Sequence, residues 1–291
     1  MLVAAHHLKG LGFEVTTIHP HLSGFGRWLE KGDYRLPPTE LSAFDAILLQ
    51  HDNTQRARQI ASLRATGKCV YIFYQNHQPT QHGDVIAGLE HAFDSSKTMV
   101  ENTRQATTAI FGGDVSAQTG MRPPPGLVHR RFMRRILIHP MSGNAAKNWP
   151  KQRFLKVAVH LKGMGLEPVF ILSPSERAGW PEVESPLNST LEDLATIVYE
   201  SGYFIGNDSG PGHLASYLSI PNLIISGNEK NMRLWRPGWL GSRVVCPPRW
   251  LPNVKGLRLR EEKWKYFVPA RVVIKELASM IGEVARPPSG P

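Results

Sequence analysis

The chain has 291 residues, 41% of them hydrophobic, and a formal net charge of +10 at pH 7. This length exceeds what one hydrophobic core usually supports, so about two domains are expected. No apolar run approaches the roughly 20 residues of a membrane span, and the first residues do not resemble a signal peptide, which disfavours integral membrane and secreted classes. The two cysteines lack metal or redox spacing and are expected to be reduced, as is typical of a cytoplasmic protein.

The first half of the chain alternates helix and strand patterns. A helical start through about Lys9 precedes predicted strands at 13–18 and 44–50, a helix at 53–65 and a strand at 68–74. Gly112-Gly113 and the proline-rich run at 121–126 then predict a linker. These patterns indicate an α/β domain over residues 1–126.

The second half opens on a strand that leads into a loop of small residues. Apolar residues 136–138 precede this loop, and Pro150 opens a predicted helix that continues from 152 to 164. Within the loop, Ser142, Gly143 and Asn144 offer hydrogen-bond donors, and Lys147 is a mobile charge suited to a diphosphate. Taken alone, the pattern also fits an exposed lysine beside a tryptophan that packs under the helix.

A glycine-rich turn follows a later apolar strand, in the run Phe204-Ile205-Gly206-Asn207-Asp208-Ser209-Gly210-Pro211-Gly212-His213-Leu214-Ala215. A helix pattern at 191–203 precedes this run, and a buried strand is predicted at 220–227. Such a turn lies at the carboxyl end of a parallel strand, where open α/β sheets bind ligands.

This turn has the residue types of an anion site. Gly206, Gly210 and Gly212 are expected to allow a tight turn and a close approach to a ligand, while the following helix directs its positive end at an anion. Asp208 and Ser209 supply oxygens and His213 a ring nitrogen. The alternative is an ordinary turn in which Asp208 or Ser209 caps the helix.

Together, the two loops resemble the C-terminal half of glycosyltransferase family 9, the lipopolysaccharide heptosyltransferases. The resemblance covers residues 136–240, with the following matching motifs: Lys147-Asn148-Trp149-Pro150, Asp208-Ser209-Gly210-Pro211-Gly212-His213-Leu214-Ala215, then Pro221, Gly227 and Trp235-Arg236-Pro237. It implies an α/β fold of the GT-B type, with two Rossmann-like domains facing each other across a cleft. Residues 1–126 would form the acceptor side and 127–268 the nucleotide-sugar-binding domain. Residues 269–291 would form a helix across the junction and a tail.

The same resemblance implies a set of donor-binding residues. Contacts to the nucleotide-sugar diphosphate are carried over to the following residues: Ser142, Gly143, Lys147, Asp208, Ser209, Gly210 and His213. Glu176, in the loop after a predicted strand at 168–172, resembles the family carboxylate that holds the ribose hydroxyls of the donor. Without the resemblance, Glu176 would be an ordinary solvated loop residue.

The implied reaction is an inverting transfer of a heptose or related sugar from an ADP-heptose-like donor to a lipopolysaccharide-type acceptor. A base deprotonates the acceptor hydroxyl, while helix N-termini, Lys147 and His213 stabilise the departing diphosphate. Neither a metal ion nor another cofactor is then obligatory. Two alternatives remain open: a sugar-nucleotide 2-epimerase, against which the Lys-x-Trp-Pro loop argues, and a binder of nucleotide sugars without catalysis.

The start of the sequence departs from the family pattern. Family members begin with a strand, a glycine-rich loop ending in Gly-Asp and a helix, whereas this sequence starts inside that helix. An N-terminal segment is therefore expected to be missing. Three explanations are open: the start is misassigned, another element fills the gap, or the chain is a degenerate member of the family. That segment would contain the loop aspartate that resembles the general base of the family. A substitute base is therefore expected among four residues at or after predicted strands: His19, His21, Asp52 and His77. Each is also compatible with an ordinary loop residue.

Basic residues gather in two stretches of the second half. They are Arg130, Arg131, Arg134 and Arg135, and Arg258, Arg260, Lys263 and Lys265. Such charge favours an anionic partner, and a glycolipid acceptor with peripheral contact at the inner face of the inner membrane fits the resemblance. Nucleic acid is not expected, because zinc-finger spacing, an RNA-recognition motif and a basic heptad are all absent from the sequence.

Overall fold

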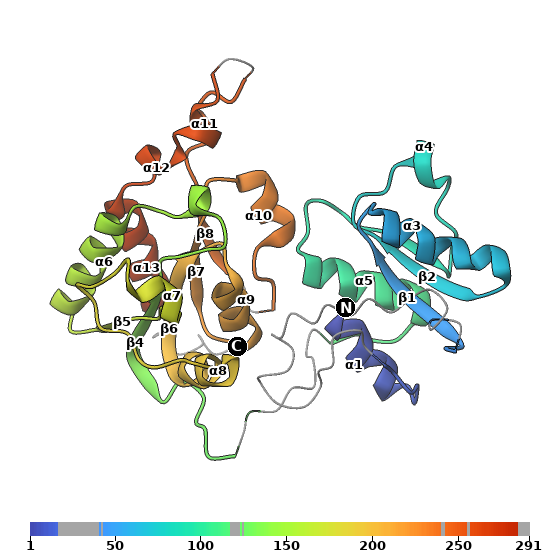
Figure 1. Ribbon diagram of the computed structural model, residues 1–291, viewed down its shortest axis with the longest axis horizontal. Helices are drawn as coiled ribbons and strands as arrows, with labels where there is room; N and C mark the ends of the chain where they lie inside the picture. The colour runs from blue at the N-terminus through green and yellow to red at the C-terminus, as the bar shows by residue number, and fades with distance from the viewer. Residues whose placement is uncertain are drawn as a thin grey trace, which may run out of the picture. The chain divides into compact units, whose positions relative to one another are not determined.

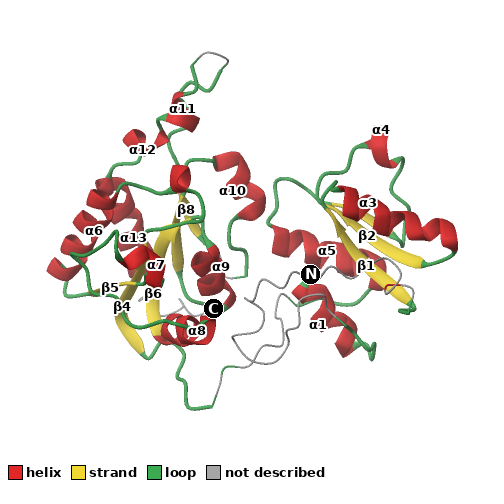
Figure 2. Cartoon of the chain, viewed as in Figure 1, coloured by secondary structure: helices red, strands yellow, loops and turns green. Residues whose placement is uncertain are grey.

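The computed structural model describes residues 1–16, 41, 43–116, 123, 125–239, 242–254 and 257–284. The chain divides into two compact units, Met1–Arg122 and Pro123–Pro291, and the division falls within the segment predicted as a linker (Figure 1). Each unit contains a parallel sheet with helices packed on it (Figure 2). The predicted fold class, an α/β protein with two Rossmann-like domains, is confirmed.

The first unit contains a three-stranded parallel sheet in the order β1-β2-β3. Its strands are β1 (Ala46–His51), β2 (Cys69–Tyr74) and β3 (Glu90–Ala92). Its helices are α1 (Leu2–Gly10), α3 (Gln55–Ala61), the 3-10 helix η2 (Ser62–Thr66), α4 (Pro79–His82) and α5 (Met99–Phe111). Thr54 and Thr98 begin α3 and α5 by accepting hydrogen bonds from Ala57 N and Glu101 N, as N-cap residues do.

Alternation along β2 gives this unit two small cores. Ile72 packs with α3 residues on one face, whereas Phe73 packs with Ala4 of α1 and Ala106 of α5 on the other. Successive side chains of a strand point to opposite faces, so a continuous apolar strand serves both cores.

The strand predicted at 13–18 is wrong over its described part. Residues 13–16 carry no strand, and 17 and 18 lie outside the described residues. Phe13 N donates instead to Leu8 O at 3.1 Å, and the Phe13 side chain is 57% exposed. The apolar alternation there is therefore not matched by burial against the sheet.

The second unit contains a five-stranded parallel sheet in the order β5-β4-β6-β7-β8. Its strands are β4 (Phe132–His139), β5 (Glu167–Phe170), β6 (Ser201–Asn207), β7 (Asn222–Ile225) and β8 (Arg243–Val245). The chain runs from β4 outward to β5 and then returns to place β6 on the other side of β4. The strand order thus reverses between β4 and β6, which makes their carboxyl ends the topological switch point of this sheet.

Short loops and helices connect and flank these strands. They are the 3-10 helix η3 (Ala145–Lys147), α6 (Lys151–Gly163), α7 (Pro174–Arg177), α8 (Leu191–Glu200), α9 (Gly210–Tyr217), α10 (Glu229–Trp235), α11 (Leu259–Glu262), α12 (Trp264–Phe267) and α13 (Ala270–Val284). The last helix packs on α6, β7 and β8 and contributes Val273, Leu277 and Met280 to the main core.

One predicted helix in this unit ends earlier than expected. The pattern at 191–203 predicts a helix throughout, but α8 ends at Glu200 and Ser201 opens β6. Gly202 explains the early strand, because a Cβ built on it would lie 2.2 Å from Met133 O of the neighbouring strand. Only glycine allows β6 to lie this close to β4.

Candidate functional site

The two predicted phosphate-type loops leave adjacent strands at the same edge of the sheet. His139, the last residue of β4, is paired in register with Gly206 near the end of β6. The loop at 140–150 and the turn at 208–210 therefore begin side by side at the switch point of the sheet, where α/β proteins bind ligands.

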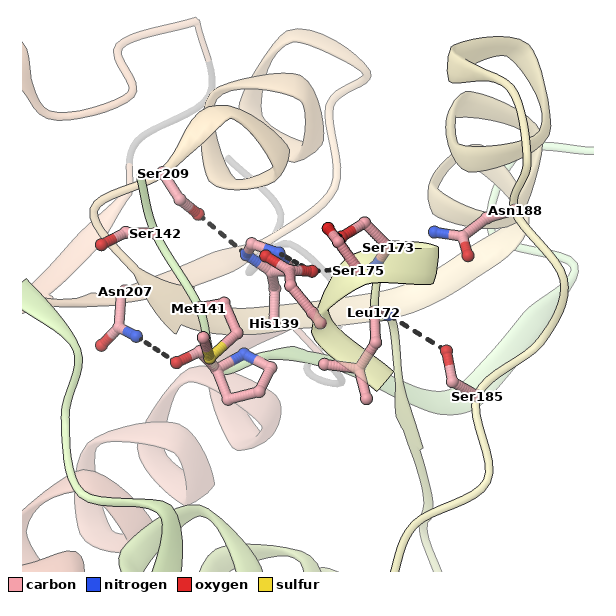
Figure 3. A network of polar contacts seen from close by, with 12 residues as sticks. His139, Met141, Ser142, Leu172, Ser173, Ser175, Ser185, Asn188, Asn207 and Ser209 are labelled. Carbon is pink, nitrogen blue, oxygen red and sulfur yellow. Dashed lines mark hydrogen bonds and ion pairs between the residues drawn. The ribbon is translucent and has the colours of Figure 1, made fainter. Parts of the chain in front are cut away.

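Asn207 connects these two loops through a fully buried side chain. Its Nδ2 donates to Pro140 O at 2.6 Å (Figure 3). Its Oδ1 accepts from Trp149 N at 3.0 Å. One amide thus fixes both ends of the loop that carries Lys147. The sequence analysis assigned no role to Asn207, although a polar residue that ends a buried apolar strand beside Asp208 was a usable signal.

Lys147 and Asp208, predicted separately, form an ion pair. Lys147 Nζ lies 2.9 Å from Asp208 Oδ2, and the side chains are 48% and 11% exposed. His213 Nε2 lies 4.0 Å from the other carboxylate oxygen. Partial burial lowers the pKa of His213 below its usual value of 6.5, and Asp208 opposes this only in part. The lysine ammonium is therefore the accessible positive charge of the group.

A cavity of about 240 Å³ lies beside this ion pair. It is lined by His139, Ser142, Gly143, Ile171, Ser173, Glu176, Asn188, Leu194, Ser209, Gly210 and Pro211. Five predicted donor-binding residues, Ser142, Gly143, Glu176, Ser209 and Gly210, thus line one cavity. Lys147, Asp208 and His213 belong to the same two loops and the start of α9 but do not line the cavity.

His139 links two of the predicted residues inside this cavity. Its Nδ1 lies 3.0 Å from Ser209 Oγ, and its Nε2 lies 3.7 Å from Glu176 Oε2 (Figure 3). The histidine is only 7% exposed. The sequence analysis did not assign His139 a role, although it stands where β4 gives way to the loop, the position at which parallel strands present ligand-binding side chains.

Glu176 is held as a carboxylate by its neighbours. Its Oε2 accepts from Ser173 N at 2.8 Å within a capping box at the start of α7. Burial raises the pKa of Glu176, but the contact with His139 and the Ser173 N–H outweigh burial, so the pKa lies below its usual 4.5. An ionised carboxylate is suited to accept hydrogen bonds from hydroxyl groups.

The glycines of the second loop act differently from the prediction. Gly206, Gly210 and Gly212 all lack a positive φ, so none serves the tight turn that was expected. A Cβ on Gly206 would lie 2.6 Å from His139 O, and one on Gly212 would lie 2.7 Å from Ile224 Cδ1. These two glycines allow close packing, whereas a Cβ on Gly210 would meet no atom within 4 Å.

Ser209 occupies the N-cap position of α9 without capping it. Its side chain makes no cap hydrogen bond, because the hydroxyl contacts His139 instead. By contrast, Thr190 accepts from Asp193 N at the start of α8. The amino end of α9 is therefore without the side-chain oxygen that usually satisfies its first N–H groups.

The segment that follows β8 braces the Lys147 loop from the other side. Trp149 Nε1 donates to Val268 O at 2.8 Å, and Trp264 Nε1 donates to Ala146 O at 3.4 Å. Lys265 Nζ donates to Ala145 O at 3.2 Å. The loop is held by hydrogen bonds from distant parts of the second unit.

Only two of the four candidate bases can be located. His19 and His21 lie outside the described residues, whereas Asp52 and His77 follow β1 and β2 in the first unit. Asp52 Oδ1 accepts from Thr54 N at 3.1 Å and from Thr54 Oγ at 2.7 Å. Although burial raises the pKa of Asp52, these hydrogen bonds hold it below its usual value.

His77 belongs to an aromatic cluster that the sequence analysis missed. Its ring lies 5.1 Å from that of Tyr74 and 5.4 Å from that of His82, which in turn lies 5.3 Å from His51. The Nε2 atom of His77 is buried without a hydrogen-bond partner. Asp52, by contrast, is exposed and accepts two hydrogen bonds through Oδ1.

Among the described residues, no three His, Cys, Asp or Glu side chains are grouped so that they could hold a metal ion. Burial raises the pKa of the Cys246 thiol to about 12, so this thiol stays protonated at neutral pH. None of the helices in the described part of the chain is long and apolar enough to span a bilayer.

Comparisons with known proteins identify the family of the chain. Residues 89–246 match the model of glycosyltransferase family 9 (heptosyltransferase). Lipopolysaccharide heptosyltransferase 3 of Escherichia coli K12 is 25% identical over 167 residues, which are 52% of this chain and 47% of that protein. The chain thus matches about half the length of this relative.

Two solved structures show the same fold at low sequence identity. E. coli heptosyltransferase WaaC with ADP gives a TM-score of 0.56 at 14% identity, over 81% of this chain and 73% of that one. The same enzyme with ADP-2-deoxy-2-fluoro heptose gives 0.55 at 15% identity, over 85% and 79%. Because the family match covers more than half of the 291 residues, the chain belongs to glycosyltransferase family 9.

Proposed function

We propose that this chain is a glycosyltransferase that transfers a heptose or related sugar, with inversion, from an ADP-heptose-like donor to a lipopolysaccharide-type acceptor. One observation carries the proposal: five predicted donor residues line a single cavity at the switch point of the sheet, beside the Lys147–Asp208 ion pair. The named functions of the relatives support the sugar and the acceptor class, and the ADP complexes of the structural neighbour support the nucleotide.

In this proposal, residues 127–268 bind the donor. Glu176 accepts hydrogen bonds from the ribose hydroxyls, because its carboxylate is ionised and faces the cavity. The diphosphate lies against Ser142, Gly143, Ser209 and Gly210, at the amino end of α9. Backbone N–H groups and the positive end of a helix favour an anion there.

Lys147 acts as the movable charge of the donor site. In the free protein it neutralises Asp208, and a bound diphosphate offers a second, more highly charged partner within reach of its flexible side chain. As the sugar departs, negative charge grows on the diphosphate. Lys147 and a hydrogen bond from His213 then stabilise the leaving group more than the bound donor, which lowers the barrier.

The transfer step needs a base on the acceptor side, which we assign to residues 1–126. The acceptor oxygen forms a bond to the anomeric carbon as its proton passes to the base. The bond from that carbon to the diphosphate breaks, and the electron pair leaves with the nucleoside diphosphate. Of the two candidates that can be located, Asp52 is exposed and contacts Thr54 through one carboxylate oxygen, whereas His77 Nε2 is buried and has no hydrogen-bond partner.

The net charge of +10 supports an anionic acceptor and a cytoplasmic enzyme at the inner face of the membrane. In this proposal the acceptor is a glycolipid with phosphorylated head groups. Neither a metal ion nor a further cofactor is obligatory in this proposal, because Lys147, His213 and the helix N-terminus stabilise the leaving group.

The test is to incubate the full chain with ADP-heptose, with and without a deacylated lipopolysaccharide acceptor, and to measure both ADP release and the sugar product. Acceptor-dependent ADP release with an inverted glycosidic product supports the proposal. An isomerised sugar nucleotide identifies an epimerase, and calorimetric binding without turnover identifies a binder that lacks catalysis. Either of these outcomes overturns it.

A further inference from the structure

The cavity is also lined by residues that the proposed contacts to the diphosphate and the ribose do not use. Among them are Ile171, Ser173, Asn188 and Leu194. Ile171 is fully buried after β5, and Leu194 is half-buried on α8. Pockets for small molecules are mainly apolar and carry a few placed polar groups. Two apolar side chains beside one amide therefore have the composition of a pocket for a flat ring.

The covalent order of a nucleotide determines which part of it can lie at this end of the cavity. The base is attached to the ribose on the side away from the diphosphate. Figure 3 shows Ser142 and Ser209, the proposed diphosphate contacts, on one side of His139, with Ser173 and Asn188 on the other side. A nucleotide whose diphosphate lies at the two loops therefore directs its base toward Asn188.

Arg177 orients the side-chain amide of Asn188. Arg177 Nη2 donates to Asn188 Oδ1 at 3.2 Å. A guanidinium group has no acceptor, so the amide has to turn its oxygen toward the arginine. The Nδ2 group then faces the other way, toward Ser173 and Ser175 in Figure 3, and it makes no hydrogen bond to a described residue. Asn188 therefore presents a donor to the cavity.

Further hydrogen bonds hold the loop that carries this amide. Arg177 Nη1 donates to Ser185 O at 3.0 Å, and Nη2 also donates to Pro186 O at 2.5 Å. The Ser185 hydroxyl accepts from Leu172 N at 3.0 Å, which connects the loop to the end of β5. Arg177 directly follows Glu176 on α7. One short helix thus positions both the carboxylate proposed for the ribose and the amide beyond it.

We propose that Asn188 recognises the base of the donor nucleotide, by donating from Nδ2 to an acceptor atom on the edge of the ring. Ile171 and Leu194 contact the ring itself, and Arg177 is a positioning residue that acts through Asn188. The inference rests on the proposed function, because it takes the ribose to lie at Glu176. In adenine, the ring atoms N1, N3 and N7 are the acceptors that such a donor can reach.

The experiment compares the binding of ADP with that of ribose 5-diphosphate, which is ADP without its base. Calorimetry is carried out on the full chain. Asn188→Leu keeps a side chain of similar size but has no donor, and Asn231→Leu, at a half-buried position of α10, is the matched control. We expect Asn188→Leu to bind ADP about three- to tenfold more weakly and ribose 5-diphosphate like the parent. The control should bind both ligands like the parent.

A second variant tests the positioning role of Arg177. Arg177→Met frees the Asn188 amide to rotate, and Arg271→Met, at an exposed position of α13, is its control. The ratio of ADP affinity to ribose 5-diphosphate affinity should fall as in Asn188→Leu. A general loss of structure would weaken both ligands and leave this ratio unchanged. Joining Arg177→Met to Asn188→Leu should lower the ratio no further, because both changes remove the same contact.

A third measurement changes the ligand and needs no variant that folds less well. The parent is titrated with 1-deaza-, 3-deaza- and 7-deaza-ADP, each of which lacks one acceptor nitrogen of adenine. At least one of them should bind about three- to tenfold more weakly than ADP, and that difference should disappear in Asn188→Leu.

Three results would overturn the inference while leaving the proposed donor site in place. They are equal binding of ADP and ribose 5-diphosphate by the parent, equal weakening of both ligands in Asn188→Leu, and full affinity for all three deaza analogues. Unchanged ADP binding in Asn188→Leu would have the same meaning. A parent that binds neither ADP nor ribose 5-diphosphate would overturn the proposed function together with the inference.

Discussion

The Nδ1 atom of His139 lies 3.0 Å from the Ser209 hydroxyl, and this contact joins the end of β4 to the start of α9. The same ring approaches Glu176 through its other nitrogen at 3.7 Å. In the proposed donor site, Ser209 meets the diphosphate and Glu176 meets the ribose. His139 therefore sets the spacing between the two ends of the nucleotide.

His139 can be tested with two partial mimics. His139→Asn places an amide near the Nδ1 position and can keep the Ser209 contact, whereas His139→Gln reaches toward Glu176. His139→Phe removes both contacts and should weaken ADP binding by about tenfold, with the two amide variants in between. Calorimetry with ADP measures this. Unchanged affinity in the phenylalanine variant would remove His139 from the donor site.

Lys147→Ala should weaken ADP binding by about ten- to a hundredfold, because one charged donor to the diphosphate is lost. Lys156→Ala, at an exposed position of α6, is the matched control and should bind like the parent. Calorimetry and the melting temperature are measured together, because Asp208 is only 11% exposed and loses its ion-pair partner in this variant. Equal ADP affinity for the two variants contradicts the role.

Glu176 should make stability depend on pH in acid. Its pKa in the folded protein lies below the usual 4.5, so its ionised form stabilises the fold above that pH. This contribution is lost as the pH falls through the folded-state pKa. Urea unfolding of the parent and Glu176→Gln should differ most near neutral pH and converge in acid. Glu167→Gln, at an exposed position, is the control for the Glu-to-Gln change itself. If the difference in the free energy of unfolding between the parent and Glu176→Gln instead grew in acid, the assignment would be refuted.

Two glycines of one turn should respond differently to alanine. Gly206→Ala places a Cβ 2.6 Å from His139 O and should lower the free energy of unfolding by about 1–3 kcal/mol. Gly210→Ala meets no atom within 4 Å, so its stability should change by less than about 0.5 kcal/mol. Its methyl group enters the cavity edge, and ADP affinity should fall. Urea unfolding and calorimetry separate the two effects, and the opposite ranking in stability would contradict the packing.

Local signals in the sequence identify the strands and loops of the second unit well. Proline, glycine and apolar runs mark where the β4 and β6 loops begin, and Ser142 and Ser209 from these loops line one cavity. The strand predicted at 13–18 fails over its described residues, because alternation alone does not supply a neighbouring strand. Phe13 remains largely in water.

The contacts that organise the site are long-range and could not be predicted in this way. Asn207 and Trp149 are 58 residues apart, and His139 and Ser209 are 70 apart. Nothing near His139 in the sequence indicates that its ring will lie between a serine and a glutamate. The sequence also did not distinguish Gly206 and Gly212, which close packing requires, from Gly210, because that distinction depends on the neighbouring atoms in the fold.

The hydrogen bonds of Trp149 also have a consequence for the order of folding. Its backbone N–H needs β6 in place, and its indole needs Val268, which lies 119 residues further along the chain. Contacts across such separations form late, because the intervening chain must be ordered first. During synthesis, the hydrogen bond between Trp149 and Val268 therefore cannot form until nearly the whole second unit has emerged, so the proposed donor site is among the last parts of this unit to be completed.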